Sequence, residues 1–187
     1  MGIFKGIRKL ASQAYRFFYP LSLVEVYKRM GVKIGSNCHF QFDVVIDHSH
    51  YWLIEIGDNV TLAPRVHLLA HDASTKLHLN YTRIGKVKIG NNVFVGAGSI
   101  VLPGVTIGNN CVIGAGSVVS KSIPENSVAA GNPCKVVNTL DHFLKNRKEE
   151  FVLAPKFDES FTLRGNIDRK KMDEMLQAIG NNYGYVV

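Results

Sequence analysis

Histidine is the side chain best suited to take a proton near neutral pH, because its ordinary pKa is about 6.5. The sequence contains seven histidines. His71 ends the segment IGDNVTLAPRVHLLAHD and is followed directly by Asp72, a carboxylate that could orient the imidazole ring. His48, in IDHSH, also lies beside an aspartate. Both histidines are candidates for a general base that deprotonates a hydroxyl group.

The cysteines offer no comparable chemistry. Cys38, Cys111 and Cys134 are an odd number and form no CxxC pair, so neither a disulfide framework nor a structural zinc site is predicted. They are expected to be free thiols in a reducing, cytoplasmic compartment. Cys134 has no adjacent base motif, which argues against a covalent mechanism through its thiol.

The charge balance is basic, with 22 lysines and arginines against 15 acidic residues and a net charge of +7. This balance favours anionic partners, such as phosphates, nucleic acid or an acidic membrane surface, without choosing among them. No run of about 20 apolar residues is present, so no transmembrane helix is predicted. The N-terminal segment lacks a continuous apolar stretch and a clear cleavage site, so no signal peptide is predicted.

A period of six residues organises the middle of the chain. One row of β-branched apolar residues comprises Ile89, Val95, Val101, Ile107, Ile113 and Val119. A second row, four places later, comprises Val93, Ser99, Val105, Cys111, Ser117 and Ile123, all small or β-branched. Shorter runs with the same spacing lie upstream, at Ile34, Phe40, Ile46 and at Ile56, Leu62, Leu68. Neither a helix nor a plain strand has this period.

Six residues fit a short strand followed by a tight corner. The aliphatic residue then points inward, and pairs such as Asn91-Asn92 and Asn109-Asn110 supply the unusual backbone angles of the corner. Three hexads would close a triangular coil of about 18 residues, and stacked coils would pair their strands in parallel. Interruptions near residues 47–53 and 70–86 are predicted to be projecting loops. The predicted fold class is therefore an all-β solenoid.

The hexads IGNNVF, VGAGSI, VLPGVT, IGNNCV and IGAGSV, followed by AGNPCKVV, resemble the hexapeptide-repeat acyltransferases. The most similar subgroup is that of the maltose and galactoside O-acetyltransferases and related enzymes that acetylate surface polysaccharides. The resemblance covers residues 31–140 and implies a left-handed parallel β-helix. It also implies a homotrimer with active sites between subunits. The implied reaction is direct transfer of an acetyl group from acetyl-CoA to a sugar or polysaccharide hydroxyl, with no metal required.

The same resemblance implies roles for particular residues. In the sugar acetyltransferases a similar IGDNV-x-x-AP segment runs into a loop that carries the catalytic histidine, and His71 occupies the matching place. His48 is the runner-up, because IDHSH resembles the Asp-His of serine acetyltransferases. Asp72, or a backbone carbonyl, is the expected orienting group. Gln41 and Asp47 stand where the sugar acetyltransferases place acceptor contacts.

Acetyl-CoA requires room for an extended pantetheine and positive charge for its phosphates. The resemblance implies contacts from Phe94, Gly96, Ala97, Gly114, Ala115, Ser120, Lys121 and Lys135. Corner geometry alone would also require the glycines, and the lysines could be solvated surface charges. Phe94 departs from the family pattern, which often has tryptophan in IGNNVW. It can pack on pantetheine but offers no indole N–H, so acceptor choice could differ.

The two ends of the chain lie outside the repeat. Residues 1–30 are predicted to be an N-terminal helical cap, 31–137 the β-helix domain, and 138–187 a C-terminal helical extension. Residues 3–30 form an amphipathic pattern that could cover the first coil, with membrane association as the alternative.

Two helices are predicted in the C-terminal extension. The first covers residues 140–151. The second covers residues 167–179, with Asn166 as its N-cap and Gly180 at its end.

Other functions stay open at this point. N-acetylation of an amino sugar would use the same parts. A non-catalytic β-helix scaffold would bind no CoA. Nucleic-acid binding rests on net charge alone and is not predicted; it would have to be steeply salt-dependent. The sequence predicts an acyltransferase and does not name its acceptor.

Overall fold

The computed structural model describes residues 22–187, so most of the predicted N-terminal helix lies outside the described residues. The described residues form two compact units that divide between Leu140 and Asp141. The first unit holds the six-residue repeat and the candidate site. The second contains the remaining C-terminal residues.

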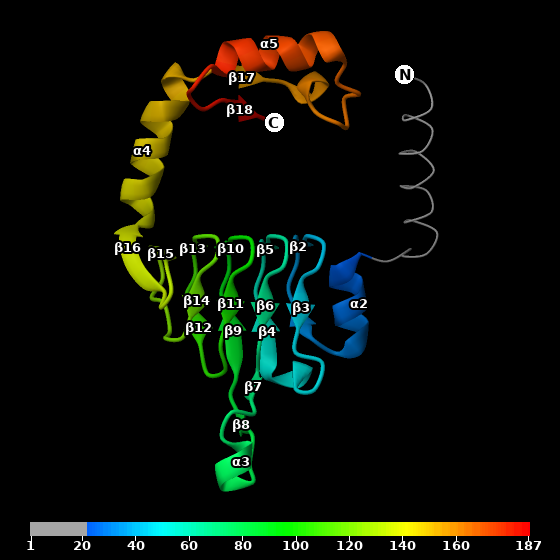
Figure 1. Ribbon diagram of the computed structural model, residues 1–187, viewed down its shortest axis with the longest axis vertical. Helices are drawn as coiled ribbons and strands as arrows, with labels where there is room; N and C mark the ends of the chain where they lie inside the picture. Colours follow the sequence, from blue (N-terminus) through cyan, green and yellow to red (C-terminus); the bar gives the residue numbers. More distant parts are fainter. Residues whose placement is uncertain (1–21) are drawn as a thin grey trace. The chain divides into compact units, whose positions relative to one another are not determined.

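Three sheets form the repeat of the first unit, and the chain visits them in turn (Figure 1). Sheet A contains β1 (Lys33–Ile34), β4 (Ile54–Ile56), β9 (Val87–Ile89) and β12 (Thr106–Ile107). Sheet B contains β2 (His39–Phe40), β5 (Thr61–Leu62), β10 (Phe94–Val95), β13 (Val112–Ile113), β15 (Ser127–Ala130) and β16 (Lys135–Thr139). Sheet C contains β3 (Val45–Ile46), β6 (His67–Leu68), β11 (Ile100–Val101) and β14 (Val118–Val119).

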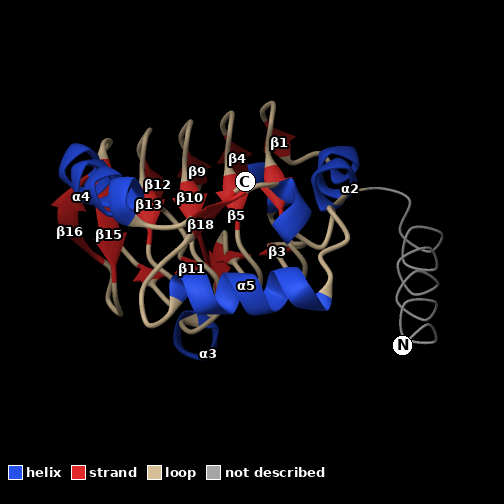
Figure 2. Cartoon of the chain, turned by 90° about the horizontal axis from the view of Figure 1, so that it is seen from above, coloured by secondary structure: helices blue, strands red, loops and turns tan. Residues whose placement is uncertain are grey.

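One passage through sheets A, B and C is here called a coil. Figure 2 shows β1, β4, β9 and β12 of successive coils side by side, and each of these neighbours pairs in parallel. The last pair of sheet B, β15 with β16, is antiparallel and ends the repeat. The parallel pairing predicted from the repeat is therefore confirmed.

The spacing between paired residues locates the insertions. Asn91 and Asn109 occupy equivalent corners 18 residues apart, as predicted for an uninterrupted coil. Lys33 and Glu55 are 22 residues apart, and Asp58 and Asn91 are 33 apart. The extra residues lie in the two predicted loops. The first contains the short helix η1 (Tyr51–Leu53), and the second contains β7 (His71–Asp72), α3 (Lys76–Leu79) and β8 (Arg83–Ile84).

Both predicted inward rows are buried. From Ile89 to Val119, no side chain of the first row is more than 1% exposed, and none of the second row exceeds 4%. Burying such aliphatic residues contributes about 1.5–3 kcal/mol for each side chain. Ser99 and Ser117, the polar members of the second row, both donate their hydroxyls to Gly114 O, at 3.0 and 2.6 Å. These bonds satisfy hydroxyl groups that would otherwise be costly to bury.

The corner between sheets A and B carries a ladder of asparagine side chains. Nδ2 of every member but the last donates to Oδ1 of the equivalent asparagine in the next coil, at 2.9–3.2 Å. The members are Asn37, Asn59, Asn92, Asn110 and Asn126, all with φ between 53 and 57°. Asparagine adopts this left-handed conformation more readily than most residues. The corner role predicted for Asn92 and Asn110 is confirmed.

Helix α2 (Leu23–Met30) begins with a capping box in which Ser22 and Glu25 bond each other's backbone N–H. Tyr27 on this helix is buried, and its hydroxyl donates to Val44 O at 3.1 Å. The described part of the N-terminal segment therefore packs on the first coil. Among residues 22–187, no helix is long and apolar enough to cross a membrane.

The second unit begins within the first turn of α4 (Leu140–Leu153). It also contains β17 (Lys156–Phe157), η2 (Glu159–Phe161), α5 (Arg169–Ile179) and β18 (Tyr185–Val186). Helices occur at both predicted places. The predicted N-cap is wrong, because Asn166 lies in a turn with φ of 56°. Asp168 caps α5 instead, and its carboxylate accepts from Lys171 N at 2.9 Å. A carboxylate there also complements the helix dipole.

Candidate active site

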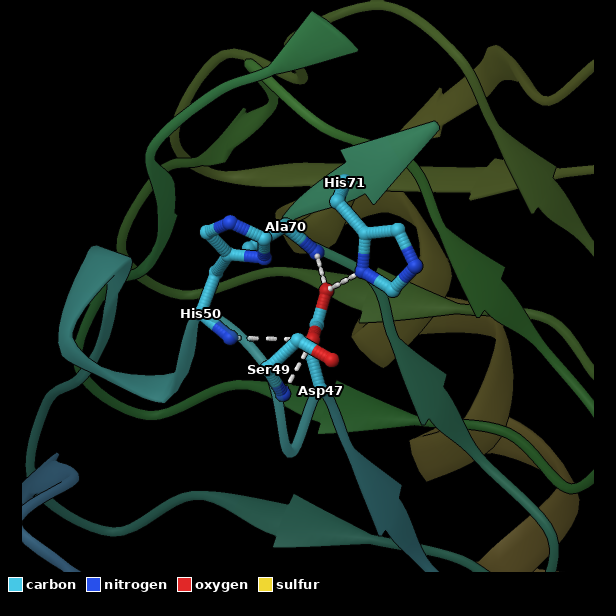
Figure 3. A network of polar contacts seen from close by, with 5 residues as sticks. All are labelled: Asp47, Ser49, His50, Ala70 and His71. Atoms are coloured by element: carbon cyan, nitrogen blue, oxygen red, sulfur yellow. Dashed lines mark hydrogen bonds and ion pairs between the residues drawn. The ribbon is translucent and has the colours of Figure 1, made fainter. Parts of the chain in front are cut away.

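Asp47 and His71 meet where the chain leaves sheet C (Figure 3). Asp47 directly follows β3, and His71 begins β7 shortly after β6 ends. Because Ile46 pairs with Leu68, the two corners lie side by side, and Asp47 N donates to Leu68 O at 2.9 Å. This register places His71 Nδ1 2.5 Å from Asp47 Oδ2.

Four hydrogen bonds hold the Asp47 carboxylate. Oδ1 accepts from the N–H groups of Ser49 and His50, at 2.9 and 3.1 Å. Oδ2 accepts from Ala70 N, at 2.9 Å, and from His71 Nδ1. Burial of the fully covered side chain would by itself raise the pKa of Asp47, but these bonds outweigh burial and lower the pKa from its usual 3.8. Asp47 is therefore a carboxylate at neutral pH.

The ionised partner determines which nitrogen of His71 carries the proton. A carboxylate can only accept hydrogen bonds, so Nδ1 must be the donor in the neutral ring. The lone pair is then on Nε2, which points away from Asp47 in Figure 3. The His71 side chain is 37% exposed, so a ligand can reach it. The arrangement suits a general base whose protonated form is stabilised by a buried anion.

Asp72 does not orient His71. Its carboxylate instead accepts from Ser74 N, at 2.9 Å, and lies 3.7 Å from the Arg83 guanidinium. The backbone bond from Ser74, followed by the Ser74 side chain and the Arg83 charge, lowers the pKa of Asp72. Successive side chains of β7 diverge, which explains why the sequence neighbour is not the spatial partner. The expectation for Asp72 is corrected, and the orienting contact belongs to Asp47.

The other candidate base lies in a different environment. His48 is exposed, and its ring centroid is 6.2 Å from that of Tyr27 on α2. His50, two residues further on, has its ring centroid 5.4 Å from that of His71. Its Nδ1 is buried and has no hydrogen-bond partner within the described range 22–187. The geometry therefore favours His71 over His48 and adds His50 as a neighbour.

Asp47, His50 and His71 also have the donor types of a metal site, with ligand atoms within 4.8 Å of one another. The contact geometry fits this function poorly. Two ligands on a tetrahedral zinc ion lie about 3.3 Å apart, given metal–ligand distances of about 2.0 Å. His71 Nδ1 and Asp47 Oδ2 are only 2.5 Å apart, and both carboxylate oxygens already accept two hydrogen bonds. The three side chains fit a hydrogen-bonded dyad with a neighbouring imidazole better than a metal centre.

Comparisons with known proteins agree with the repeat and its corners. Residues 86–121 match the family model described as bacterial transferase hexapeptide (six repeats). Protein CapG of Staphylococcus aureus is 40% identical over 124 residues, which cover 62% of this chain and 70% of CapG. The galactoside O-acetyltransferase of Lactococcus lactis is 36% identical over 166 residues, which cover 71% of this chain and 79% of that protein. The chain belongs to the hexapeptide-repeat acyltransferase family.

Solved structures of this acyltransferase family have the same fold. A galactoside acetyltransferase in complex with coenzyme A aligns with a TM-score of 0.52 at 35% identity, over 65% of this chain and 71% of that one. A hexapeptide-repeat acetyltransferase from Vibrio cholerae, complexed with acetyl coenzyme A, aligns with a TM-score of 0.53 at 26% identity, over 58% and 60% of the two chains. The chain is thus an acyltransferase.

In this acyltransferase the predicted CoA-binding glycines lie in the corner between sheets B and C. A side chain at Gly96 would collide with the backbone nitrogen of Ala115, and one at Gly114 would lie 2.9 Å from the Cβ of Ala130. Their N–H groups donate to Ile113 O and Ala129 O of adjacent strands, both at 2.8 Å. Close stacking of coils therefore accounts for both glycines. Their amides are not available to stabilise an oxyanion.

The remaining predicted CoA contacts are accessible. Ala97 is half-buried and Ala115 exposed, in the same corner as the glycines. Phe94 is 45% exposed on the outer face of sheet B. The other members, Ser120, Lys121 and Lys135, are exposed. A role for these residues in CoA binding stays a prediction.

The two predicted acceptor contacts are separated. Gln41 follows β2 in the corner between sheets B and C, whereas Asp47 follows β3 in the next corner. Asp47 is fully buried and bonded to His71, so its carboxylate contacts the imidazole ring and is not exposed to an acceptor. The sequence pattern did not predict that Asp47 pairs with His71. The signal that could have found it is their equivalent position, just after corresponding strands of adjacent coils.

Proposed function

We propose that this acyltransferase transfers an acetyl group from acetyl-CoA to a hydroxyl of a sugar or polysaccharide precursor, with His71 as the general base. The observation that carries the proposal is the Asp47–His71 contact, which leaves Nε2 as an accessible proton acceptor. The galactoside O-acetyltransferases among the relatives support the acyl donor and the acceptor class.

The proposed reaction proceeds without a covalent enzyme intermediate. Nε2 of His71 takes the proton of the acceptor hydroxyl as its oxygen attacks the thioester carbonyl. The tetrahedral intermediate then breaks its C–S bond, and the sulfur receives the proton from the imidazolium. Asp47 stabilises that imidazolium and holds the ring in one orientation, as the aspartate of a catalytic triad does. None of these proposed steps uses a cysteine thiol.

The proposed donor site lies along the exposed residues near sheets B and C. Phe94 offers an apolar surface for pantetheine, and Ala97 and Ala115 lie half-buried and exposed at the neighbouring corner. Lys121 and Lys135 supply positive charge for phosphate groups, and Ser120 supplies a neighbouring hydroxyl. We also propose a reducing, cytoplasmic location, in which Cys38, Cys111 and Cys134 would stay free thiols.

We further propose that the enzyme is a homotrimer of left-handed helices that packs through sheet C. Residues at the outward positions of sheet C are half-buried and mostly apolar: Val45, His67, Ile100 and Val118. Those of sheet A are polar or charged: Lys33, Glu55, Lys88 and Thr106. Apolar surface of this kind favours association. A solution mass near three times 20.7 kDa, lost in Ile100→Lys, would support this interface.

Thiol release from acetyl-CoA, measured with a panel of sugars, tests the catalytic proposal. Wild type should release CoA only when a suitable sugar is present. His71→Ala should lower kcat by about 10²–10⁴, the contribution typical of a general base. His78→Ala, an exposed histidine on α3, is the matched control and should retain activity. Full activity in His71→Ala would refute the assignment.

A further inference from the structure

Trp52 is the only tryptophan in the chain, and its side chain is 58% exposed. It lies on η1, in the insertion that interrupts the first coil between sheets C and A. The insertion is the same segment that supplies Asp47 and His50 to the candidate site. Trp52 therefore presents a large apolar surface to solvent near the proposed base. Packing of the core does not account for a tryptophan at this exposed position.

The ring of His50 lies between Trp52 and the base. The Trp52 and His50 ring centroids are 5.4 Å apart, with an angle of 50° between the ring planes. The His50 and His71 centroids are also 5.4 Å apart, with an angle of 43°. Tyr51 contacts Trp52 edge-on, at 5.3 Å and 83°. Trp52 therefore lies two ring contacts from His71.

The position of this aromatic row is fixed by the same carboxylate that orients the base. Asp47 Oδ1 accepts from the backbone N–H groups of Ser49 and His50, where the insertion begins. Leu53 N then donates to His50 O at 3.0 Å and closes the turn that carries Trp52. One oxygen of Asp47 thus holds the insertion, while the other holds His71. This shared anchor sets the distance between Trp52 and the base.

We propose that Trp52 is the platform on which the ring of the sugar acceptor stacks, so that one hydroxyl reaches His71 Nε2. The inference rests on the proposed function and adds the residue that selects the acceptor. A pyranose has a face of C–H groups and a rim of hydroxyls. The indole presents an apolar face and a polar N–H, which match both parts. Because Trp52 lies in an insertion, the platform is independent of the repeat that forms the donor site.

The single tryptophan makes the proposal directly measurable. Tryptophan emission, excited selectively over that of the seven tyrosines, reports Trp52 alone, so maltose and methyl β-galactoside can be titrated into the enzyme without acetyl-CoA. The sugar that serves as acceptor should change the emission in a saturable way. Trp52→Ala should raise the KM for that sugar about tenfold, while kcat and the KM for acetyl-CoA stay near wild type. Trp52→Phe should recover most of the loss.

Phe42→Ala is the matched control and should leave the KM for the sugar unchanged. Phe42 is about as exposed as Trp52, at 59%, but it lies in a different corner, between sheets B and C. An unchanged sugar KM in Trp52→Ala, with wild type active, would overturn the platform and leave the proposed function intact. A shift only in the KM for acetyl-CoA, or a changed oligomeric mass, would also overturn it. If wild type acetylates no sugar, the acceptor class fails, and the platform fails with it.

Discussion

Asp47 Oδ2 and His71 Nδ1 are 2.5 Å apart although the two residues are 24 positions apart in the sequence. Each residue belongs to a different coil, so only the stacking of coils brings them together. The carboxylate is fully covered, whereas the imidazole is 37% exposed. The pair therefore combines a fixed interior anchor with an accessible proton acceptor, and it yields the first prediction.

Asp47→Asn should lower kcat by at least about 100-fold, because the amide can present its N–H to Nδ1 and favour the wrong ring tautomer. The KM for acetyl-CoA should change little. Steady-state kinetics compared with Asp72→Asn provide the control, since Asp72 bonds Ser74 rather than the ring. Equal losses in both variants would contradict the assignment of Asp47.

The lowered pKa of Asp47 predicts how stability depends on pH. Since the folded state favours the carboxylate, Asp47 contributes stability that is fully present above its unfolded pKa of about 3.8. That contribution should be lost as pH falls through the lower folded-state pKa. Urea unfolding at several pH values should show the stability difference between wild type and Asp47→Asn shrinking below pH about 4. A stability difference that grows on acidification would show that folding does not lower the pKa of Asp47.

Asn92 should contribute to stability both through its backbone conformation and through its side-chain bonds. Its φ is 56°, and its amide bonds Asn59 and Asn110. Asn92→Gly keeps the conformation accessible but removes the bonds, at a cost of about 1 kcal/mol. Asn92→Ala should cost roughly 1 kcal/mol more, from left-handed strain. Thermal unfolding of both variants measures the two contributions, and equal melting temperatures would exclude the strain.

Gly96→Ala should destabilise the protein even without CoA. The added methyl would collide with backbone of the next coil at Ala115, with an expected cost of about 1–3 kcal/mol. Gly98→Asn is the control: Gly98 has φ of 68°, open space around it, and a conformation that asparagine tolerates. Differential scanning calorimetry on the apoenzyme measures the melting temperatures of both variants. An unchanged melting temperature in Gly96→Ala would mean that stacking does not require the glycine.

The periodic part of the fold could be predicted from the sequence because every inward position must be filled by a residue that can be buried. Val95, Val101 and Ile107 are each completely buried, as their six-residue spacing predicts. The corner asparagines followed from backbone preferences that act locally. By contrast, the cap of α5 depended on a choice between Asn166 and Asp168 two positions apart, which periodicity cannot resolve.

The candidate site was only partly predictable, for a different reason. His71 could be placed because it lies at the start of an interruption that the repeat itself reveals. Its partner Asp47 was harder to identify. The spacing of Ile46 and Leu68 indicates that Asp47 lies near His71 in the stack, but the repeat does not specify that the two side chains point toward each other. The positions of the Trp52 and His50 rings beside this pair were hidden for the same reason. Insertions carry no periodicity, so their side chains have no position that the sequence pattern specifies.

The asparagine ladder also bears on how such a protein changes length during evolution. Every amide donates in the same direction along the stack, from Asn37 towards Asn126. A gene segment that encodes one 18-residue coil could be duplicated, and the new asparagine would accept from one neighbour and donate to the other without any compensating substitution. The number of coils is then limited at the ends, by α2 and by the antiparallel strand β16.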